Sequence, residues 1–501
     1  MSSSHEHYRW WALSCTSLGM LLAATNSGTL IIALPDLERS LHTSLLALVW
    51  VILAYLIAAT VLVLMAGRLS DLFGRKRAYV GGFLVFAAAS LGAGFAADGT
   101  VLILWRILQG IGSAFLFANA AALVTDAFPR EQLGLAMGAN TMMAAVGLVL
   151  GPVLGGALVA ISWQWVFWFN VPIALAGAAW GGLVLRELAK PDTQRGYDVL
   201  GTVTFVVGLT GLVLGVSRGG LTGWNDGIVI AGLLAAAVLL PLWVVIERRS
   251  RAPMLDLQIF RDRLFAAASA AAFINGLARF ALMFLFVFYY QGAQGNSPIT
   301  AGIKLAPLAV GMLISSPLAG IYADRHGSRA LAALGMLFSA AGLAAMTTLG
   351  VHSPYWQSAL WLLAVGVGSG MFNSPNTAAM MGVVPPHRRG IAAGARMLLQ
   401  NTGAVLSIAF VMAVVTSAIP KATLFAIFSG VTHGLSTAKL APFIANMHAA
   451  LWVLAAVSLV GTGVCLLRPS HRDSQVEPAD VETNATETRT EDDPRAVALS
   501  R

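Results

Sequence analysis

Charged side chains are scarce throughout this chain. Only 11% of its 501 residues are Asp, Glu, Lys or Arg, whereas 57% are hydrophobic and the mean hydropathy is +0.76. A soluble globular protein carries about 25% charged residues. Because the deficit extends over the whole length, the composition excludes a soluble domain with a single anchor and indicates an integral membrane protein.

Cysteine is also scarce, since only Cys15 and Cys465 are present and each lies inside an apolar segment. This argues against a disulfide framework, and we expect two buried thiols that behave as small hydrophobic groups. The apolar run after Arg9 is longer than that of a signal peptide, and no small-residue cleavage site follows it. We therefore expect this run to be a retained membrane helix.

Long apolar runs are abundant. A membrane span needs roughly 20 predominantly apolar residues, and the sequence predicts fourteen spans. They cover 12–34, 44–66, 78–97, 100–124, 134–160, 165–186, 199–217, 227–246, 264–290, 299–322, 329–350, 356–380, 391–416 and 446–467. An even number of spans places both termini on the same side of the membrane.

Basic residues are divided unequally between the two sides. The connections on the side of the termini hold 17 Lys and Arg residues, and the opposite connections hold 4. Because Lys and Arg favour the cytoplasmic side, we expect a multi-pass protein of the plasma (cell inner) membrane with both termini cytoplasmic. The net charge of +8 then reflects orientation, and no nucleic-acid partner is expected. Residues 1–11 form the cytoplasmic N-terminus, and the polar segment 468–501 is predicted to be a disordered cytoplasmic tail.

Two of the expected cytoplasmic loops resemble each other. One reads GRLSDLFGRKR (67–77) and the other reads GIYADRHGSR (320–329). Each contains Gly, an acid four residues later, a second Gly three residues after the acid, and then basic residues. Two copies separated by about half the chain indicate two related helix bundles.

Further motifs make the resemblance to one family specific. They are LILWRILQGIGSA (102–114), GLVLGPVLGG (147–156), WQWVFWFNVP (163–172) and YYQGAQGNSPITAGIKLAP (289–307). With the loop at 67–77, they resemble the major facilitator superfamily, and within it the fourteen-helix drug:proton antiporter group of multidrug and antibiotic exporters. The resemblance extends from about residue 11 to residue 467.

The resemblance implies an all-α integral membrane protein with two six-helix bundles and 14 transmembrane helices. The expected N-terminal bundle is 12–186, the C-terminal bundle is 264–467, and an inserted two-helix segment at 199–246 separates them. The resemblance also implies a monomer that contacts membrane lipids and a small-molecule substrate. No enzymatic activity, catalytic residue, metal or cofactor is expected, and the proton gradient is the expected source of energy.

The loop at 67–77 is expected to act as a gate. Asp71 can face a helix N-terminus, where backbone dipoles favour a negative charge, and Arg75 can reach Asp126. The resemblance implies that such contacts hold the cytoplasmic gate shut in the outward-facing state; the alternative is a solvated basic loop. The residues that we assign to this gate are Gly67, Asp71, Gly74, Arg75, Arg77, Asp126, Asp324 and Arg325.

The fifth expected helix carries the motif associated with antiporters. Gly147, Gly151 and Gly155 recur every four residues and share one face, and small residues allow close helix approach in a membrane. Pro152 favours a bend, and Gly156 completes the motif. We expect this face to be a surface over which the two bundles rock; ordinary tight packing is compatible with that role.

Ionisable residues within the spans are candidates for function, and here all of them are basic. The 23 acids fall in loops, tails or helix ends, whereas Arg106, Arg279, Lys304 and Arg396 lie within spans. Lys304 is near the outer end of its span and can reach water. In the family, an Asp usually stands nine residues before the proline of ALP; here that position is Asn26, an amide that cannot carry a proton.

Amides accompany the embedded arginines. Asn275 is one helical turn before Arg279, so both can face the same cavity. The residues that we expect to line a central substrate cavity are Asn26, Arg106, Gln109, Asn275, Arg279, Asn373, Asn376, Arg396, Gln400 and Asn401. Such a cavity is polar to positive and suits an anionic compound; in the alternative, these residues only hold helices together. Asp36 and Glu38, at the outer end of the first span, are other possible protonation sites.

Together these features predict a secondary active efflux transporter. It would export a small amphipathic or anionic compound of the antibiotic or drug type by alternating access, driven by the proton gradient. The alternative is a transporter or flippase for lipids on the same fold, or a facilitator that needs no gradient.

Overall fold

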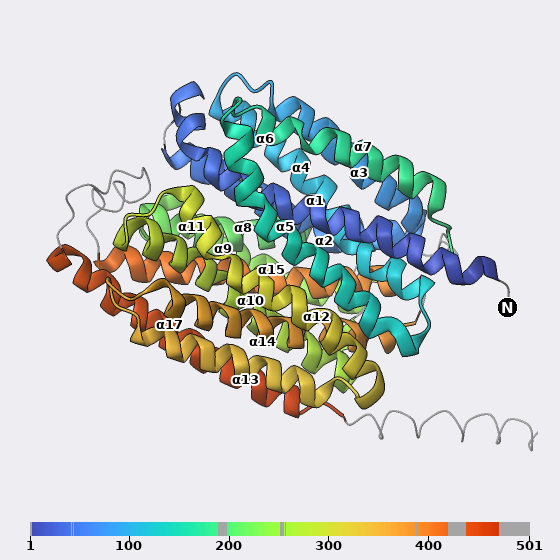
Figure 1. Ribbon diagram of the computed structural model, residues 1–501. Coiled ribbons are helices and arrows are strands. Elements are labelled where there is room, and N and C mark those ends of the chain that lie inside the picture. The colour runs from blue at the N-terminus through green and yellow to red at the C-terminus, as the bar shows by residue number, and fades with distance from the viewer. Residues whose placement is uncertain are drawn as a thin grey trace, which may run out of the picture.

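The computed structural model describes residues 3–41, 43, 45–188, 198–250, 255, 257–385, 388–418 and 437–469, and helices dominate these residues (Figure 1). Lipid offers no hydrogen-bond partners to the backbone. A helix satisfies its N–H and C=O groups within its own segment, so apolar sequence of this length adopts helices in a membrane.

The helices of the N-terminal half pack on one another. They are α1 (Ser3–Leu41), α2 (Leu45–Phe73), α3 (Arg75–Ala93), α4 (Gly99–Ala127), the 3-10 turn η1 (Arg130–Gln132), α5 (Leu133–Val159), the short α6 (Trp165–Trp168) and α7 (Asn170–Val184). Here α1 packs against α5, α2 packs against α4, and α3 packs against α4 and α7.

The C-terminal half repeats this arrangement. Its helices are α10 (Arg263–Phe288), the single π-helical turn η3 (Tyr289–Ala293), α11 (Pro298–Lys304), α12 (Ala306–His326), α13 (Arg329–Ala345), the 3-10 turn η4 (Met346–Thr348), α14 (Tyr355–Gly382), α15 (Arg389–Ala418) and α17 (Thr437–Leu466), preceded by the 3-10 turn η2 (Leu257–Arg261). In this half α10 packs against α15, α12 against α14, and α13 against α17. The two halves meet mainly where α5 contacts α12 and where α2 contacts α15.

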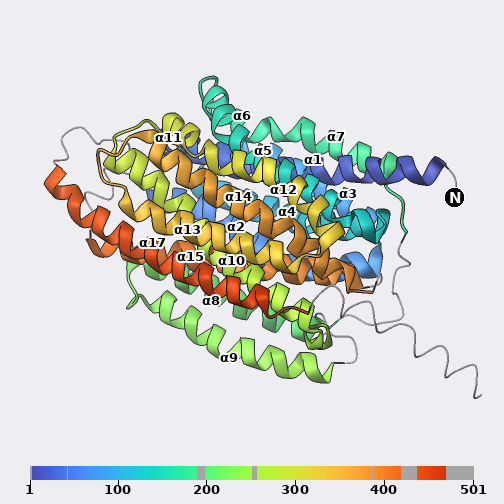
Figure 2. The ribbon, with the colours of Figure 1, turned by 60° about the horizontal axis from the view of Figure 1, so that its bottom comes forward.

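Between the halves, the chain forms a helical hairpin of α8 (Val199–Thr222) and α9 (Gly227–Arg249). Figure 2 shows α9 at the edge of the molecule. The inner helix α8 packs against both α2 and α15. Phe205 and Leu209 of α8 share a hydrophobic cluster with Val61 of α2 and Leu398 of α15. The hairpin therefore covers the seam between α2 and α15.

Acidic residues lie at helix ends, where several of them cap the first turn. Asp98 accepts hydrogen bonds from the backbone N–H groups of Thr100 (2.8 Å) and Val101 (2.9 Å) at the start of α4. Asp198, Asp226 and Asp262 cap α8, α9 and α10 in the same way. A hydrogen bond from Arg218, together with the one from the Ile228 N–H group, lowers the pKa of the Asp226 carboxyl. Aspartate is a favourable N-cap because its carboxylate satisfies N–H groups that have no partner in the helix.

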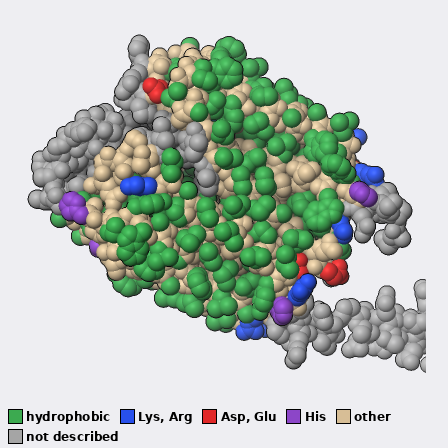
Figure 3. Space-filling view, in the orientation of Figure 1, with side chains coloured by type: hydrophobic (Ala, Val, Ile, Leu, Met, Phe, Trp, Pro, Cys, Tyr) green, Lys and Arg blue, Asp and Glu red, His purple; other side chains and the backbone are tan. Residues whose placement is uncertain are grey.

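The surface agrees with a membrane protein. Figure 3 shows hydrophobic side chains over the middle of one face, with charged groups mostly toward its ends. Leu104, Leu183, Leu234 and Trp452 are among the large apolar side chains that are more than half exposed. Within the described ranges, eight helices are long and apolar enough to cross a membrane. The prediction of fourteen spans is not confirmed by this number and stays a prediction, as do the exact domain boundaries.

Candidate functional site

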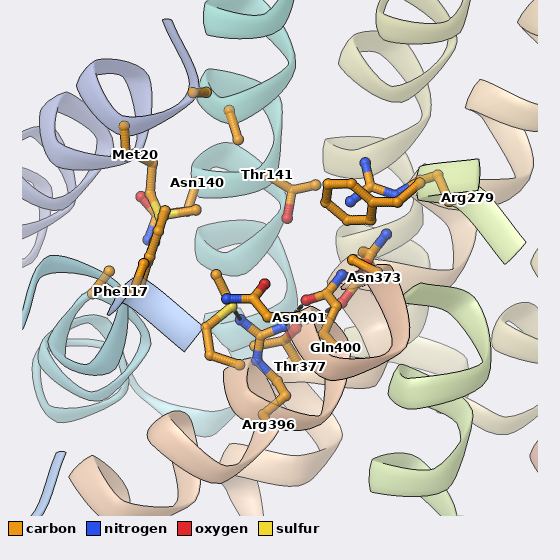
Figure 4. Close-up of a pocket in the computed structure, with 18 of the residues that line it drawn as sticks. Met20, Phe117, Asn140, Thr141, Arg279, Asn373, Thr377, Arg396, Gln400 and Asn401 are labelled. Atoms are coloured by element: carbon orange, nitrogen blue, oxygen red, sulfur yellow. Dashed lines mark hydrogen bonds between the residues drawn. The ribbon is translucent and has the colours of Figure 1, made fainter. Parts of the chain in front are cut away.

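A cavity of about 240 Å³ lies between the two halves (Figure 4). The N-terminal half contributes residues of α1, α2, α4 and α5, and the C-terminal half contributes residues of α10, α12, α14 and α15. Of the residues predicted to line a cavity, five do so: Arg279, Asn373, Arg396, Gln400 and Asn401. The described lining contains no Asp or Glu.

The C-terminal half contributes both arginines of the described lining and most of its amides, beside several apolar side chains. Arg396 donates from Nη1 to Gln400 Oε1 (3.0 Å), and Gln400 donates from Nε2 to Asn373 Oδ1 (3.2 Å). Asn373 in turn donates to the carbonyl oxygen of Ser369 (3.0 Å). This chain of hydrogen bonds joins α15 to α14 and positions the amides beside Arg396.

The opposite wall, formed by the N-terminal half, is mostly apolar. Met20 of α1, Phe117 of α4 and Met137 of α5 line it together with several alanines. Asn140, which also faces the cavity, accepts hydrogen bonds from Thr16 (3.3 Å) and Ser17 (3.0 Å) of α1. The two halves therefore present different chemistry to the same space.

Three further predicted residues form a separate buried cluster behind Tyr55. Asn26 Oδ1 accepts from Gln109 Nε2 (3.2 Å) and, at 3.5 Å, from Arg106 Nη1. Arg106 also donates to Gln109 Oε1, and from Nε to the carbonyl oxygen of Val51 (3.0 Å). The guanidinium lies 4.4 Å from the centre of the Tyr55 ring. Tyr55 lines the cavity, but Asn26, Arg106 and Gln109 do not.

Asn275 and Asn376 lie away from the cavity. Asn275 donates to the Met336 sulfur (3.6 Å) on α13, although it is one turn from Arg279. Asn376 donates to the carbonyl oxygen of Ala268 (3.2 Å) and accepts from Arg468. Arg468, which the sequence places at the start of the polar tail, is buried at the end of α17. Both amides thus connect helices of the C-terminal half.

The motif at 67–77, expected as a loop, forms the end of α2 and the start of α3 with only Gly74 between them, and it contacts the C-terminal half. Asp71 accepts hydrogen bonds from Arg75 (Nε 3.0 Å, Nη2 2.8 Å) and, through its other oxygen, from the backbone N–H of Ile391 (3.0 Å). Asp126 pairs with Arg75 and also with Arg389 (3.1 Å). Because Ile391 is in the first turn of α15, the Asp71 carboxylate lies at the positive end of that helix.

The second copy of the motif, at 320–329, makes the equivalent contact from the C-terminal half to the N-terminal half. Asp324, near the end of α12, accepts from the backbone N–H groups of Gly134 (2.8 Å) and Leu135 (3.1 Å) in the first turn of α5. Close approach depends on glycine, since a Cβ atom on Gly134 would lie 2.5 Å from the Gly320 carbonyl oxygen. The repeated motif thus ties each half to the other at one end of the helices, which we call the motif end.

The remaining predicted gate residues lie nearby. Gly67 is buried against the backbone of Gly390 on α15. Gly74 has φ 102°, a left-handed conformation that suits glycine. Glu187, which the sequence did not single out, caps α3 by accepting from the N–H groups of Arg75 (2.7 Å) and Lys76 (3.1 Å). Arg77 and Arg325 are exposed at the motif end.

The glycine face of α5 is not where we expected it. Gly147, Gly151 and Gly155 pack against α1 of the same half, and a Cβ on Gly151 would lie 2.8 Å from the Gly28 Cα atom. The interpretation of this face as a surface between the two bundles is therefore wrong. Other α5 residues face the C-terminal half, because Gly138 meets the backbone of Ser316 and Ala145 packs with Met312. Gly156 is half-buried, and the Pro152 side chain lies outside the described part.

The charged residues expected near the outer ends of spans lie in different surroundings. Lys304 is half-buried and donates to Asn296 (3.1 Å) and Gln294 (3.3 Å), with the rings of Tyr290 and Tyr355 nearby. Asp36 lines a separate open hollow beside α6. The side chain of Glu38 lies outside the described part.

Sequence reasoning missed several residues of the site. Tyr55, Phe117 and Asn140 line the cavity, and Arg389 belongs to the charged contact at the motif end. Tyr55 and Phe117 are aromatic residues within long apolar runs, and nothing in the local sequence distinguishes them from the other aromatic residues of such runs. Asn140 is an amide inside a predicted span and could have been found by the argument that selected Asn373 and Gln400.

A helical membrane fold in two similar halves, with a cavity between them, is typical of membrane transporters. Comparison with known proteins agrees, because the family model of the Major Facilitator Superfamily matches residues 16–408 and 268–491. The chain belongs to this superfamily, whose members are transporters and not enzymes.

The names of two similar proteins refer to drug resistance, and one of these names also refers to export. The "Tetracenomycin C resistance and export protein" of Streptomyces glaucescens is 30% identical over 402 residues, which are 80% of this chain and 74% of the relative. "Multidrug resistance protein Stp" of Mycobacterium tuberculosis is 33% identical over 409 residues, covering 79% of this chain and 74% of the relative. "Uncharacterized MFS-type transporter EfpA" of the same species is 32% identical and covers 88% of this chain and 84% of its own length.

Solved structures show the same fold at low identity. The human organic anion transporter MFSD10 (TETRAN) has a TM-score of 0.62 at 15% identity and covers 91% of this chain and 99% of its own. The proton:xylose symporter XylE has a TM-score of 0.64 at 15% identity, with 91% and 95% covered.

Proposed function

We propose that this protein is a secondary active efflux transporter that exports a small amphipathic or anionic compound of the antibiotic or drug type by alternating access. The observation that carries the proposal is the cavity between the halves, which both halves line and which combines apolar side chains with two arginines and several amides. The names of two relatives, one an antibiotic resistance and export protein and one a multidrug resistance protein, support it.

The contacts at the motif end support a gate. Asp71 binds the N-terminus of α15 and Asp324 binds that of α5, so each carboxylate must leave a helix of the other half before this end can open. Arg389 adds an ion pair across the same boundary through Asp126. We infer that this end faces the cytoplasm, as the basic loops predict, and that the structure has its inner gate closed. A monomer in the plasma membrane, with both termini cytoplasmic, completes the proposal.

The resemblance favours the proton gradient, but Asn26 stands where the family usually has a titratable acid. The cavity and the gate together support alternating access, and we propose that an electrochemical gradient drives export.

The proposal predicts export that depends on Asp71. Inverted membrane vesicles with the wild type should accumulate at least one member of a panel of fluorescent anionic, neutral and cationic amphipathic compounds. Asp71→Asn, at equal membrane abundance, should reduce the initial rate about tenfold, because hydrogen bonds to a charged group contribute ~1.5–3 kcal/mol to the closed state.

Asp98→Asn is the matched control, because Asp98 is exposed and caps α4 by accepting from two N–H groups of that helix. It should leave the rate within about twofold, since an N-cap change affects local stability. Normal rates with Asp71→Asn would contradict the gate. No accumulation of any compound above empty vesicles would contradict export of this class.

A further inference from the structure

We propose that Arg279 and Arg396 form an anion-binding wall that selects amphipathic acids, with the acidic group held by the C-terminal half and the apolar part held by the N-terminal half. The inference rests on the proposed function, because it names the substrate class of the same cavity. It concerns two arginines on one wall and does not involve Arg106, which lies behind Tyr55.

Arg279 has few partners for a half-buried guanidinium. Nη1 lies 3.6 Å from the Met312 sulfur, which is a weak acceptor, and the group lies 4.7 Å from the centre of the Phe280 ring. Nε is buried without a hydrogen-bond partner among the described residues. None of these described partners carries a negative charge. Because the side chain also lines the cavity, its positive charge is available to a ligand.

Arg396 is in a similar state on α15. Nη1 donates to Gln400 Oε1 (3.0 Å), Nη2 lies 3.4 Å from the Met397 sulfur, and Nε is buried without a described partner. Gln400 and Met397 are neutral, so they accept hydrogen bonds from Arg396 but do not balance its positive charge. Within the described chain, no acid forms an ion pair with either arginine.

Two uncompensated arginines facing one cavity indicate the chemistry of the ligand. A charge at membrane depth is costly unless it is paired or hydrated, and a buried ion without its partner is strongly unfavourable. An anion would supply the missing charge, and the planar guanidinium fork suits the oxygens of a carboxylate, sulfonate or phosphate. The cavity is correspondingly a poor site for an organic cation.

The rest of the ligand is constrained by the opposite wall. Figure 4 shows Met20 and Phe117 across the cavity from Arg279 and Asn373. Met offers adaptable, polarisable apolar contact, and the Phe ring offers a flat apolar surface on which an aromatic group can stack. The arrangement therefore orients a molecule that has an aromatic or aliphatic body and one acidic group.

A matched pair of probes tests the inference. 1-Anilinonaphthalene-8-sulfonate is an anion, and N-phenyl-1-naphthylamine has the same skeleton without the sulfonate. Binding of each to the full chain in nanodiscs of neutral lipid is measured by equilibrium dialysis, with empty nanodiscs subtracted. We expect the anion to bind the wild type about tenfold or more tightly than the neutral probe.

Variants on the two walls should then separate charge from packing. Arg279→Gln and Arg396→Gln should each weaken the anion about tenfold and change the neutral probe less than about threefold. Arg279→Lys should recover part of the anion affinity, which would show that the protein is folded. Phe117→Ala should weaken both probes alike. Arg263→Gln, at the exposed start of α10, should change neither.

Equal affinity for the two probes, or Gln variants that weaken both alike, would overturn the anion-binding wall. Repetition in nanodiscs containing phosphatidylglycerol tests the other source of an anion. If that lipid abolishes binding of the sulfonate, the arginines hold a lipid headgroup, and the assignment to soluble acids is wrong. Since binding needs no transport, a failed export assay with intact anion selectivity would remove only the proposed function. Export of cations alone would remove only this inference.

Discussion

At the scale of single residues, the most informative position is Asn26. Its amide oxygen accepts from Gln109 and Arg106, and its Nδ2 group is buried without a partner among the described residues. The amide thus stands beside a fully buried guanidinium whose described hydrogen-bond partners are all neutral. An amide at this position satisfies hydrogen bonds but leaves the charge of Arg106 uncompensated.

Asn26→Asp should therefore stabilise the folded protein. The substitution removes an unsatisfied donor and places a carboxylate beside Arg106, and a hydrogen bond to a charged group contributes roughly 1.5–3 kcal/mol. Thermal unfolding of both proteins in the same detergent should show a higher midpoint for the variant. Because Tyr55 separates Arg106 from the cavity, the variant should weaken sulfonate binding less than Arg279→Gln does.

The control for this prediction is Arg106→Gln. When Asn26→Asp is added to Arg106→Gln, it should no longer raise the midpoint, because the arginine that pairs with the carboxylate is absent. An unchanged or lower midpoint for Asn26→Asp alone would show that the carboxylate costs more to bury than it gains from the arginine. A loss of sulfonate binding as large as that of Arg279→Gln would instead place Arg106 within the binding site.

At the scale of helices, the glycines divide α5 into two faces. Gly147, Gly151 and Gly155 let α1 approach within one half, whereas Gly134 and Gly138 let α12 approach from the other half. If the two halves rock against each other during transport, the α1–α5 contact must be kept and part of the α5–α12 contact must be released. Tight packing between α1 and α5 is therefore a matter of stability.

Gly151→Leu should destabilise the protein, because a Cβ at this position would already lie 2.8 Å from the Gly28 Cα atom. Overpacking of this kind typically costs about 1–3 kcal/mol, so the midpoint of thermal unfolding should fall. Gly182→Leu is the matched control, since nothing lies within 4 Å of a Cβ on that α7 glycine. Equal midpoints for the two variants would contradict the tight α1–α5 contact.

At the scale of the whole molecule, the distribution of charge bears on the source of energy. Every acid of the sequence can be assigned to a loop, tail or helix end, and the cavity presents arginines. An exported anion moves with the electrical field of a cell whose interior is negative, and this contributes ~2.3 kcal/mol per charge per 100 mV. The membrane potential can thus drive export without a proton carrier in mid-membrane.

Transport of the sulfonate probe should respond to an imposed potential. In proteoliposomes with potassium and valinomycin, a potential that favours movement of the anion should increase the initial rate, with no pH difference across the membrane. A ~100 mV potential is sufficient for a several-fold effect. A rate that follows the pH difference and ignores the potential would restore the prediction of proton exchange and require a titratable group elsewhere.

Much of the architecture is determined by the sequence alone. The length and number of the apolar runs require membrane helices, because lipid leaves the backbone no other partners, and the repeated loops at 67–77 and 320–329 already indicate two similar halves. The contact between Arg75 and Asp126 was also predictable, since both motifs place charges at the same ends of neighbouring helices.

Only the tertiary structure decides which face of each helix meets which neighbour. Spacing on α10 allowed Asn275 and Arg279 to share a cavity, yet the rotation of the helix directs Asn275 to Met336. Likewise, the glycines of α5 indicated close approach without indicating that α1 is the partner. Asn26 and Arg106 were both expected to line the cavity; they are neighbours, but Tyr55 lines the cavity in their place. Periodicity along one helix records which residues share a face, whereas the packing of all the helices determines what that face contacts.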